Sequence, residues 1–173
     1  MEWKDLIIQI FDISLDLLES YLDGLRQEDL NWQPKPDCNS IGWKTWHLSR
    51  VIDRGISLST DEEQLWITDG WCNKFDRPAD PDDRDHRQTP EQIAAFKSPD
   101  KGTLIGYYRA VIDKLRNWLN MLDNSDLDRE FDDSVSHILP TARSRVNAIV
   151  RETQQHLGQI AYDRGLLQGH GWQ

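Results

Sequence analysis

Residues 104–122, LIGYYRAVIDKLRNWLNML, determine the fold class of this chain. Their apolar residues recur at intervals of four and three, at Leu104, Tyr108, Val111, Leu115, Trp118 and Leu122. This spacing places them on one face of an α-helix and is typical of a helix that packs in a bundle. We therefore predict a long helix here, which begins at Pro99 with Ser98 as its N-cap.

Three further stretches show the same helical periodicity. They cover residues 3–26, residues 39 or 40 to 58, and residues 141–167. Gly169 and Gly171 follow the last stretch, as glycines often do just beyond the end of a helix. No strand-like alternation is long enough to require a sheet. The sequence therefore predicts an all-α fold, a four-helix bundle.

A segment of about forty residues, 59–97, separates the second and third predicted helices and is rich in Asp, Arg and Pro. This length exceeds that of a hairpin turn and favours a long crossover. Thr60 with Glu63, and Thr89 with Gln92, match the capping-box pattern. We therefore expect two short helices within the crossover, the second of them over residues 91–97.

The composition indicates one domain, residues 1–173, because 38% hydrophobic residues suffice for one core. Thirty acidic and twenty basic residues give a net charge of −10, which repels nucleic-acid phosphates and anionic lipid headgroups. No stretch reaches the ~20 apolar residues of a membrane span, and Glu2 and Asp5 stand where a signal peptide carries lysines. We expect a cytoplasmic protein that binds neither nucleic acid nor membranes. Cys38 and Cys72 favour two free thiols over a disulfide framework.

Three residues in apolar helical stretches, His47, Glu152 and His156, carry most of the chemical information. Glu152 and His156 are four residues apart, so both side chains leave one helix face one turn apart. With His47 from another helix, they form a donor set known from catalytic zinc and non-haem iron sites, with at least one coordination position open. A surface pair, or a single hydrogen-bonded core histidine, explains the same spacing without a metal.

The identity of the metal does not follow from the ligands, because this donor set suits several divalent ions. We favour Zn²⁺, with Ni²⁺, Mn²⁺ and Fe²⁺ as alternatives. Arg54 lies two helical turns beyond His47 on the same face, where it could hold a substrate carboxylate or pair with an acidic neighbour.

Other polar residues are weaker candidates for the site. Asp163 lies seven residues after His156 and could orient a ligand imidazole, with a buried ion pair as the alternative. Cys72 is expected to be a small packing residue. The remaining histidines, His86, His137 and His170, are expected to be solvated.

Several segments of the chain resemble the DinB-like superfamily, which includes the metal-binding N-terminal domain of mycothiol-dependent maleylpyruvate isomerase. They are residues 40–48 (SIGWKTWHL), 65–66 (LW) with 69–71 (DGW), and 151–167 (RETQQHLGQIAYDRGLL) with 171–172 (GW). The resemblance implies a four-helix bundle of up-down-down-up order, with a long crossover that leaves the third helix parallel to the second. It also implies one divalent metal ion at the open end of the bundle.

In that family the metal ligands are a histidine from the second helix and two residues four apart on the fourth, either two histidines or a glutamate and a histidine. His47, Glu152 and His156 match the glutamate variant. The family's reactions are thiol-dependent isomerisation, thiol transfer and proposed hydrolysis, so a low-molecular-weight thiol is a candidate cofactor. The sequence ends at Gln173 without the second domain of the isomerase, which leaves the isomerase reaction and the thiol open. Bundles of this family often pair, which suggests a homodimer.

Two functions from different classes follow from these residues. The first is a metal-dependent enzyme whose ion activates a small thiol or a water molecule against an electrophilic small-molecule substrate, by thiol transfer, isomerisation or hydrolysis. No catalytic base is identifiable beyond the ligands. The second is a non-catalytic bundle, in which the metal only stabilises the fold or the protein binds a ligand without turnover.

Overall fold

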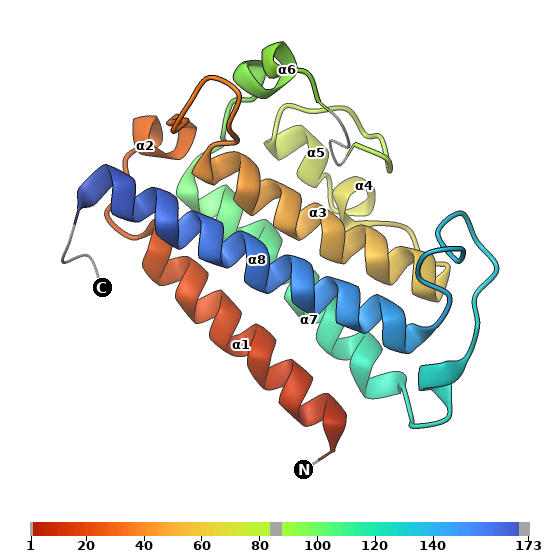
Figure 1. Ribbon diagram of the computed structural model, residues 1–173. Helices are drawn as coiled ribbons and strands as arrows, with labels where there is room; N and C mark the ends of the chain where they lie inside the picture. Colours follow the sequence, from red (N-terminus) through yellow and green to blue (C-terminus); the bar gives the residue numbers. More distant parts are fainter. Residues whose placement is uncertain (1, 84–87, 170–173) are drawn as a thin grey trace.

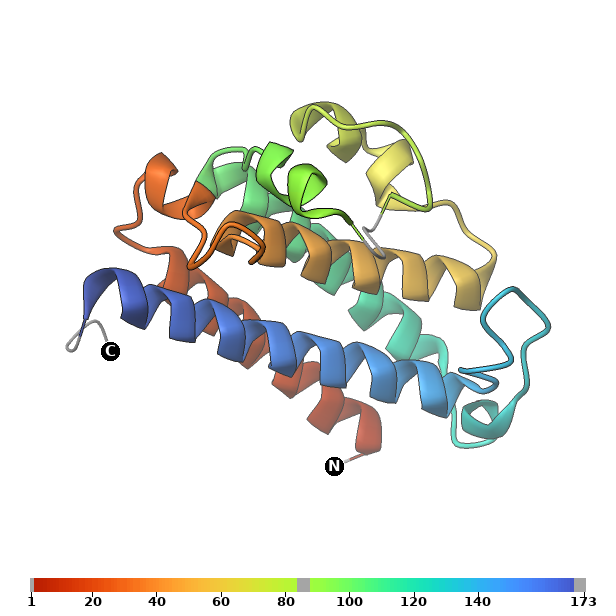
Figure 2. The same ribbon diagram turned by 45° about the horizontal axis from the view of Figure 1, so that its top comes forward.

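The computed structural model describes residues 2–83 and 88–169, and its four long helices form a bundle (Figure 1). They are α1 (Trp3–Leu22), α3 (Ile41–Thr60), α7 (Lys101–Met121) and α8 (Ala142–Gln168). Helices α1 and α8 run in one direction and α3 and α7 run in the other, which is the up-down-down-up order (Figures 1 and 2). The prediction of an all-α four-helix bundle is confirmed.

Helices α3 and α7 are parallel, and their hydrogen bonds show it. The Tyr107 hydroxyl donates to Asp53 at 2.8 Å, and the Lys114 ammonium group donates to the Ser57 hydroxyl at 3.2 Å. Residue numbers therefore rise together along the two helices. Two parallel neighbours need a long connection, which here is the crossover between Thr60 and Lys101.

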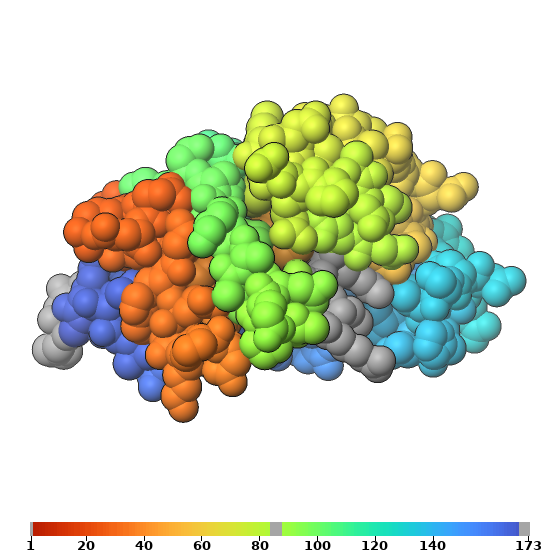
Figure 3. All heavy atoms as spheres, turned by 90° about the horizontal axis from the view of Figure 1, so that it is seen from above, coloured from red at the N-terminus to blue at the C-terminus, as the bar shows by residue number. Residues whose placement is uncertain are grey.

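The described residues of the crossover, 61–83 and 88–100, form three short helices, and the crossover lies over α3 and α7 (Figure 2). They are α4 (Leu65–Thr68), α5 (Trp71–Lys74) and α6 (Pro90–Ala95). Figure 3 views the molecule from above, and the segments coloured yellow to green occupy the middle of this face. The crossover thus covers one side of the bundle.

Two buried charged residues of α3 attach the crossover to the bundle. Asp53 is fully buried, and its carboxylate accepts hydrogen bonds from the backbone N–H groups of Leu65 and Trp66 at 3.0 and 2.8 Å. Arg50 is also fully buried, and its Nε donates to the backbone carbonyl oxygen of Asp83 at 2.9 Å. These bonds satisfy polar groups that would otherwise be buried without a partner.

Three of the long helices have an end that differs from the prediction by at least two residues. Helix α3 ends at Thr60 rather than at residue 58. Helix α7 begins at Lys101, not at Pro99, because the N-cap is Asp100, whose carboxylate accepts a hydrogen bond from the Thr103 N–H at 3.0 Å. Helix α1 ends at Leu22, before Gly24 with its left-handed φ of +71°. The chain then forms the short helix α2 (Gln27–Asn31), which the sequence did not predict.

One of the two capping boxes was assigned correctly. The Thr89 hydroxyl accepts a hydrogen bond from the Gln92 N–H at 3.3 Å, and the Gln92 side chain accepts one from the Thr89 N–H at 2.8 Å. These bonds confirm a helix start at this point. The helix, α6, ends at Ala95 rather than at residue 97 as predicted. The Thr60 assignment was wrong: Thr60 is the last residue of α3, and its hydroxyl donates to the Ile56 carbonyl oxygen at 3.1 Å. The next helix begins at Leu65, and α5 was not expected.

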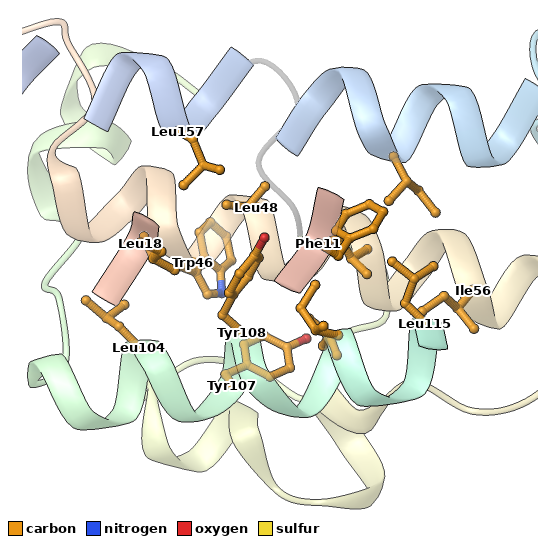
Figure 4. Packing of buried hydrophobic residues seen from close by; sticks show 14 of the residues in the cluster. Phe11, Leu18, Trp46, Leu48, Ile56, Leu104, Tyr107, Tyr108, Leu115 and Leu157 are labelled. Atoms are coloured by element: carbon orange, nitrogen blue, oxygen red, sulfur yellow. The ribbon is translucent and has the colours of Figure 1, made fainter. Parts of the chain in front are cut away.

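The four long helices share one hydrophobic core (Figure 4). Side chains from each of them meet there, including Phe11 and Leu18 from α1, Trp46 and Ile56 from α3, Leu104 and Leu115 from α7, and Leu157 from α8. Cys72 is 2% exposed within this cluster, which fits its expected role as a packing residue. Within residues 2–83 and 88–169, none of the helices combines the length and apolar composition needed to cross a bilayer.

Candidate metal centre

The structure brings the three predicted ligands together at the α3–α8 contact. One nitrogen or oxygen atom from each of His47, Glu152 and His156 lies within 4.8 Å of the other two. His156 Nε2 and Glu152 Oε2 are 3.6 Å apart. A tetrahedral ion with ligands at about 2.0–2.2 Å holds its donor atoms about 3.3–3.6 Å apart, so the His156–Glu152 distance already fits such an ion, and the 4.8 Å limit for the full set exceeds that range by about 1.2 Å.

The orientation of His156 suits a ligand. Its Nδ1 lies 2.9 Å from Oε1 of Gln159, one turn further along α8. Because an amide oxygen only accepts, this contact places the proton on Nδ1 and leaves the Nε2 lone pair facing Glu152. Metal-bound histidines commonly donate their second N–H in this way, which fixes the ring and its tautomer.

The protonation state of His156 also suits a ligand. Burial lowers the pKa of this imidazole below its ordinary value, and the nearby Lys44 charge acts in the same direction. The Gln159 hydrogen bond and the Glu152 charge oppose this shift without cancelling it. The imidazole is therefore neutral at neutral pH, which is the form that binds a metal.

His47 is held between aromatic groups. Its ring stacks on Trp43 with centroids 5.0 Å apart and an interplanar angle of 15°, and it meets the His156 ring edge-on at 4.7 Å. His47 and His156 are each 8% exposed, whereas the Glu152 side chain is 26% exposed. The two imidazoles thus form the buried wall of the site, and solvent reaches it from the Glu152 side.

Asp163 pairs with a lysine of α3. Its carboxylate forms a buried ion pair with the Lys44 ammonium group, which also donates to the Asn39 carbonyl oxygen. This was the alternative interpretation of Asp163. The pair joins α3 to α8 and compensates both buried charges.

A cavity of about 420 Å³, which we call the side cavity, opens beside the candidate ligands. His47 and Glu152 line one part of it, and Arg54 lines another. Arg54 also pairs with Asp82 of the crossover, with Nη2 and Oδ1 3.2 Å apart. The volume falls within the usual range of small-molecule sites, roughly 300–1,000 Å³.

The opposite wall of the side cavity is the segment 134–139, which precedes α8. This segment is held by Arg145, whose guanidinium pairs with Asp133 at 2.6 Å and donates to the carbonyl oxygens of Leu58 and Leu139 at 2.8 and 3.2 Å. Arg145 is 2% exposed. A buried arginine therefore fixes the position of the wall relative to both α3 and α8.

Sequence reasoning missed three parts of the site. Gln159 and Trp43 contact the ligand histidines, and His137 lines the side cavity although it is exposed, as expected. Gln159 lies three residues after His156 and Trp43 lies four residues before His47, so helical spacing was a usable signal for both, whereas His137 had none. His86 and His170 lie outside the described residues.

The fold and the site together define a four-helix bundle with a candidate His-Glu-His metal centre. The family model of the DinB superfamily matches residues 10–160, and the chain belongs to this superfamily. The superfamily is generally metal-associated.

A solved structure is similar over nearly the full length. It is titled "Crystal structure of the conserved protein of locus from Enterococcus faecalis" and is 25% identical in sequence, with a TM-score of 0.86. The match covers 98% of this chain and 99% of that chain. No curated protein matches the sequence.

Proposed function

We propose that this protein is a metal-dependent cytoplasmic enzyme in which His47, Glu152 and His156 hold one divalent ion, with Zn²⁺ favoured. The observation that carries the proposal is the convergence of these donor atoms within 4.8 Å beside a cavity of small-molecule size. A divalent ion supplies Lewis acidity, which lowers the pKa of a thiol or a water molecule and polarises a substrate carbonyl. The reaction class is thiol transfer, isomerisation or hydrolysis.

The residues of the chain have separate tasks in this proposal. Gln159 holds the His156 ring, and Trp43 holds the His47 ring, so both imidazoles are fixed before an ion binds. The exposed side of Glu152 leaves access for a thiol, a water molecule and the substrate. Arg54, on the same cavity, holds a substrate carboxylate.

The second candidate is a non-catalytic bundle that the metal stabilises. The observation in its favour is that the two buried imidazoles come from different helices, α3 and α8, so one ion would cross-link them. An ion that binds only the folded form stabilises it whether or not catalysis occurs.

Elemental analysis of the purified full chain tests metal binding directly. About one divalent ion per chain is expected, with loss of the ion in His47→Ala and His156→Ala. His137→Ala is the matched control, because this histidine lines the side cavity but is not among the three donors. Equal metal content in all three variants would refute the assigned ligands.

Activity assays then separate the two candidates. A panel of thiol-transferase, isomerase and hydrolase substrates is measured with the metal-loaded and the metal-stripped protein, together with the melting temperature. Metal-dependent turnover supports the enzyme. A large fall in melting temperature on metal removal, with no metal-dependent turnover in the panel, supports the structural role.

A further inference from the structure

The side cavity has an apolar section between the candidate metal ligands and Arg54. On α3, Val51 lies one turn beyond His47, and Arg54 lies a further three residues along. On α8, Ile149 lies three residues before Glu152 and lines the same section. A ligand that reaches from the metal position to Arg54 must therefore pass along aliphatic side chains.

The wall opposite these helices is also apolar. Val135 and Ile138 line the side cavity from the segment 134–139. Ile138 is 68% exposed, although exposing such a large aliphatic side chain to water is unfavourable. It lines the same cavity as Val51 and Ile149, so the three side chains together offer an aliphatic surface to an apolar ligand.

Among the residues that the structure describes, three arginines line the side cavity of a chain whose net charge is −10, which favours an anionic ligand. Arg145 is fully engaged with Asp133 and with backbone carbonyl groups. Arg151 is 69% exposed and pairs with Glu152, one of the candidate metal ligands. Neither of them is well placed to bind a substrate.

Of these three described arginines, Arg54 can exchange its partner. Its side chain is only 12% exposed, whereas that of its partner Asp82 is 72% exposed. Pairs with a solvent-exposed carboxylate contribute little stability, since water solvates the carboxylate after release. A ligand carboxylate inside the cavity can therefore displace Asp82 at small cost and form a charge-assisted hydrogen bond with Arg54.

We infer that the side cavity binds a substrate with an apolar body, whose reacting group lies at the metal position and whose carboxylate pairs with Arg54. This inference rests on the proposed function and adds the class of substrate. Seven residues separate His47 from Arg54, which corresponds to about 10 Å along the helix axis. The carboxylate is thus several carbon atoms away from the reacting group, not adjacent to it.

Mercapto acids of increasing length test the inference, because their thiol binds zinc and their carboxylate can pair with Arg54. Mercaptopropionate, mercaptohexanoate and mercaptooctanoate, each with a terminal thiol, are titrated into the zinc-loaded full chain by calorimetry. Affinity is expected to rise about fourfold for each added methylene that the cavity buries. The neutral analogue mercaptohexanol is expected to bind at least about tenfold more weakly than mercaptohexanoate.

Substitutions assign these effects to residues. Arg54→Gln should remove the preference for the acid over the alcohol. The control is Arg109→Gln, which alters an exposed arginine that pairs with Glu19 on another face of the molecule, and this variant should keep the preference. Ile138→Ser should reduce the gain in affinity with length, whereas Ile13→Ser, at a 50% exposed isoleucine of α1, should not. Zinc content is measured for every variant.

The possible outcomes distinguish this inference from the proposed function. Equal binding of acid and alcohol by the unchanged protein, or an intact preference in Arg54→Gln, overturns the carboxylate assignment. Equal affinity at all lengths overturns the apolar body. If the protein takes up no divalent ion, the proposed function fails. Titration with hexanoate and hexanol needs no metal, and it still decides whether Arg54 and the apolar wall bind a ligand with an apolar body and a carboxylate.

Discussion

Gln159 accepts a hydrogen bond from His156 at 2.9 Å and thereby turns the other ring nitrogen toward Glu152. Both residues lie on α8, so the helix itself sets this relationship. The same helix face therefore carries two candidate ligands and the residue that orients one of them.

Replacing Gln159 should weaken metal binding without unfolding the protein. Loss of such an orienting partner typically reduces metal affinity by about 10–100-fold, and we expect this range for Gln159→Ala. Competition with a chromophoric chelator measures the affinity. Gln155→Ala, at an exposed glutamine of the same helix, is the control and should keep the original affinity; identical affinities for the two variants would remove the assigned role of Gln159.

The buried carboxylate of Asp53 should be essential for stability. It accepts hydrogen bonds from two backbone N–H groups and from the Tyr107 hydroxyl, and Lys114 and Arg50 lie 3.6 and 3.7 Å from it. Asp53→Ala removes the acceptor of the two backbone N–H groups and of the Tyr107 hydroxyl, and it removes the negative charge that compensates the fully buried Arg50, which should cost about 3–5 kcal/mol of unfolding free energy. Urea denaturation measures the loss, and Asp113→Ala, at an exposed aspartate of α7, should change stability by less than about 0.5 kcal/mol.

Two glycines should respond to alanine in opposite directions. A Cβ at Gly42 of α3 would lie 2.2 Å from the Ser98 hydroxyl oxygen and 3.0 Å from the Leu30 carbonyl oxygen, so Gly42→Ala should destabilise the fold by about 1–3 kcal/mol. Gly158 of α8 has no atom within 4 Å of such a Cβ, so Gly158→Ala should stabilise it by about 0.5–1 kcal/mol. Thermal denaturation compares the two variants, and a shift of the same sign in both would contradict the packing described for Gly42.

The pair between Asp133 and Arg145 should contribute stability that acid removes. Burial raises the pKa of Asp133. Hydrogen bonds from the Val135 N–H and the Arg145 guanidinium lower this pKa by more than burial raises it, so the folded-state pKa lies below the ordinary value. Protons then bind more readily to the unfolded chain. The stability that the pair contributes is complete at pH values above the pKa of Asp133 in the unfolded chain, about 3.9. It disappears as the pH falls through the pKa of Asp133 in the folded protein.

Denaturation curves at several pH values test this pair. At neutral pH, Asp133→Asn should cost about 2–3 kcal/mol, because Arg145 stays buried without its carboxylate. The difference between this variant and the unchanged protein should be constant above about pH 5 and should shrink below about pH 4. Asp132→Asn, at the neighbouring exposed aspartate, should cost less than about 0.5 kcal/mol at neutral pH.

The sequence predicted those features that depend on short-range periodicity. The repeat from Leu104 to Leu122 defined a bundle helix, and the spacing of Glu152 and His156 placed two donors on one face, because helix geometry alone fixes such relationships. Helix ends were less predictable. Asp100 rather than Ser98 caps α7, and both are chemically suitable caps, so only the path of the chain decides between them.

Features that depend on long-range contacts could not be predicted. The wall of the side cavity comes from the segment 134–139, which has no periodicity, and its position depends on Arg145 reaching Asp133 and Leu58. The attachment of the crossover to Asp53 and Arg50 likewise joins residues far apart in the chain. No local pattern in the sequence encodes these pairings.

The side cavity is built from a helical face on one side and a short non-helical segment on the other, and this division has an evolutionary consequence. Relatives that retain the bundle, the three donors and the Asp133–Arg145 pair can vary residues 134–139 without disturbing the three candidate ligands. Exchange of this one segment would then change the shape of the cavity, while the helical scaffold beneath it stays the same.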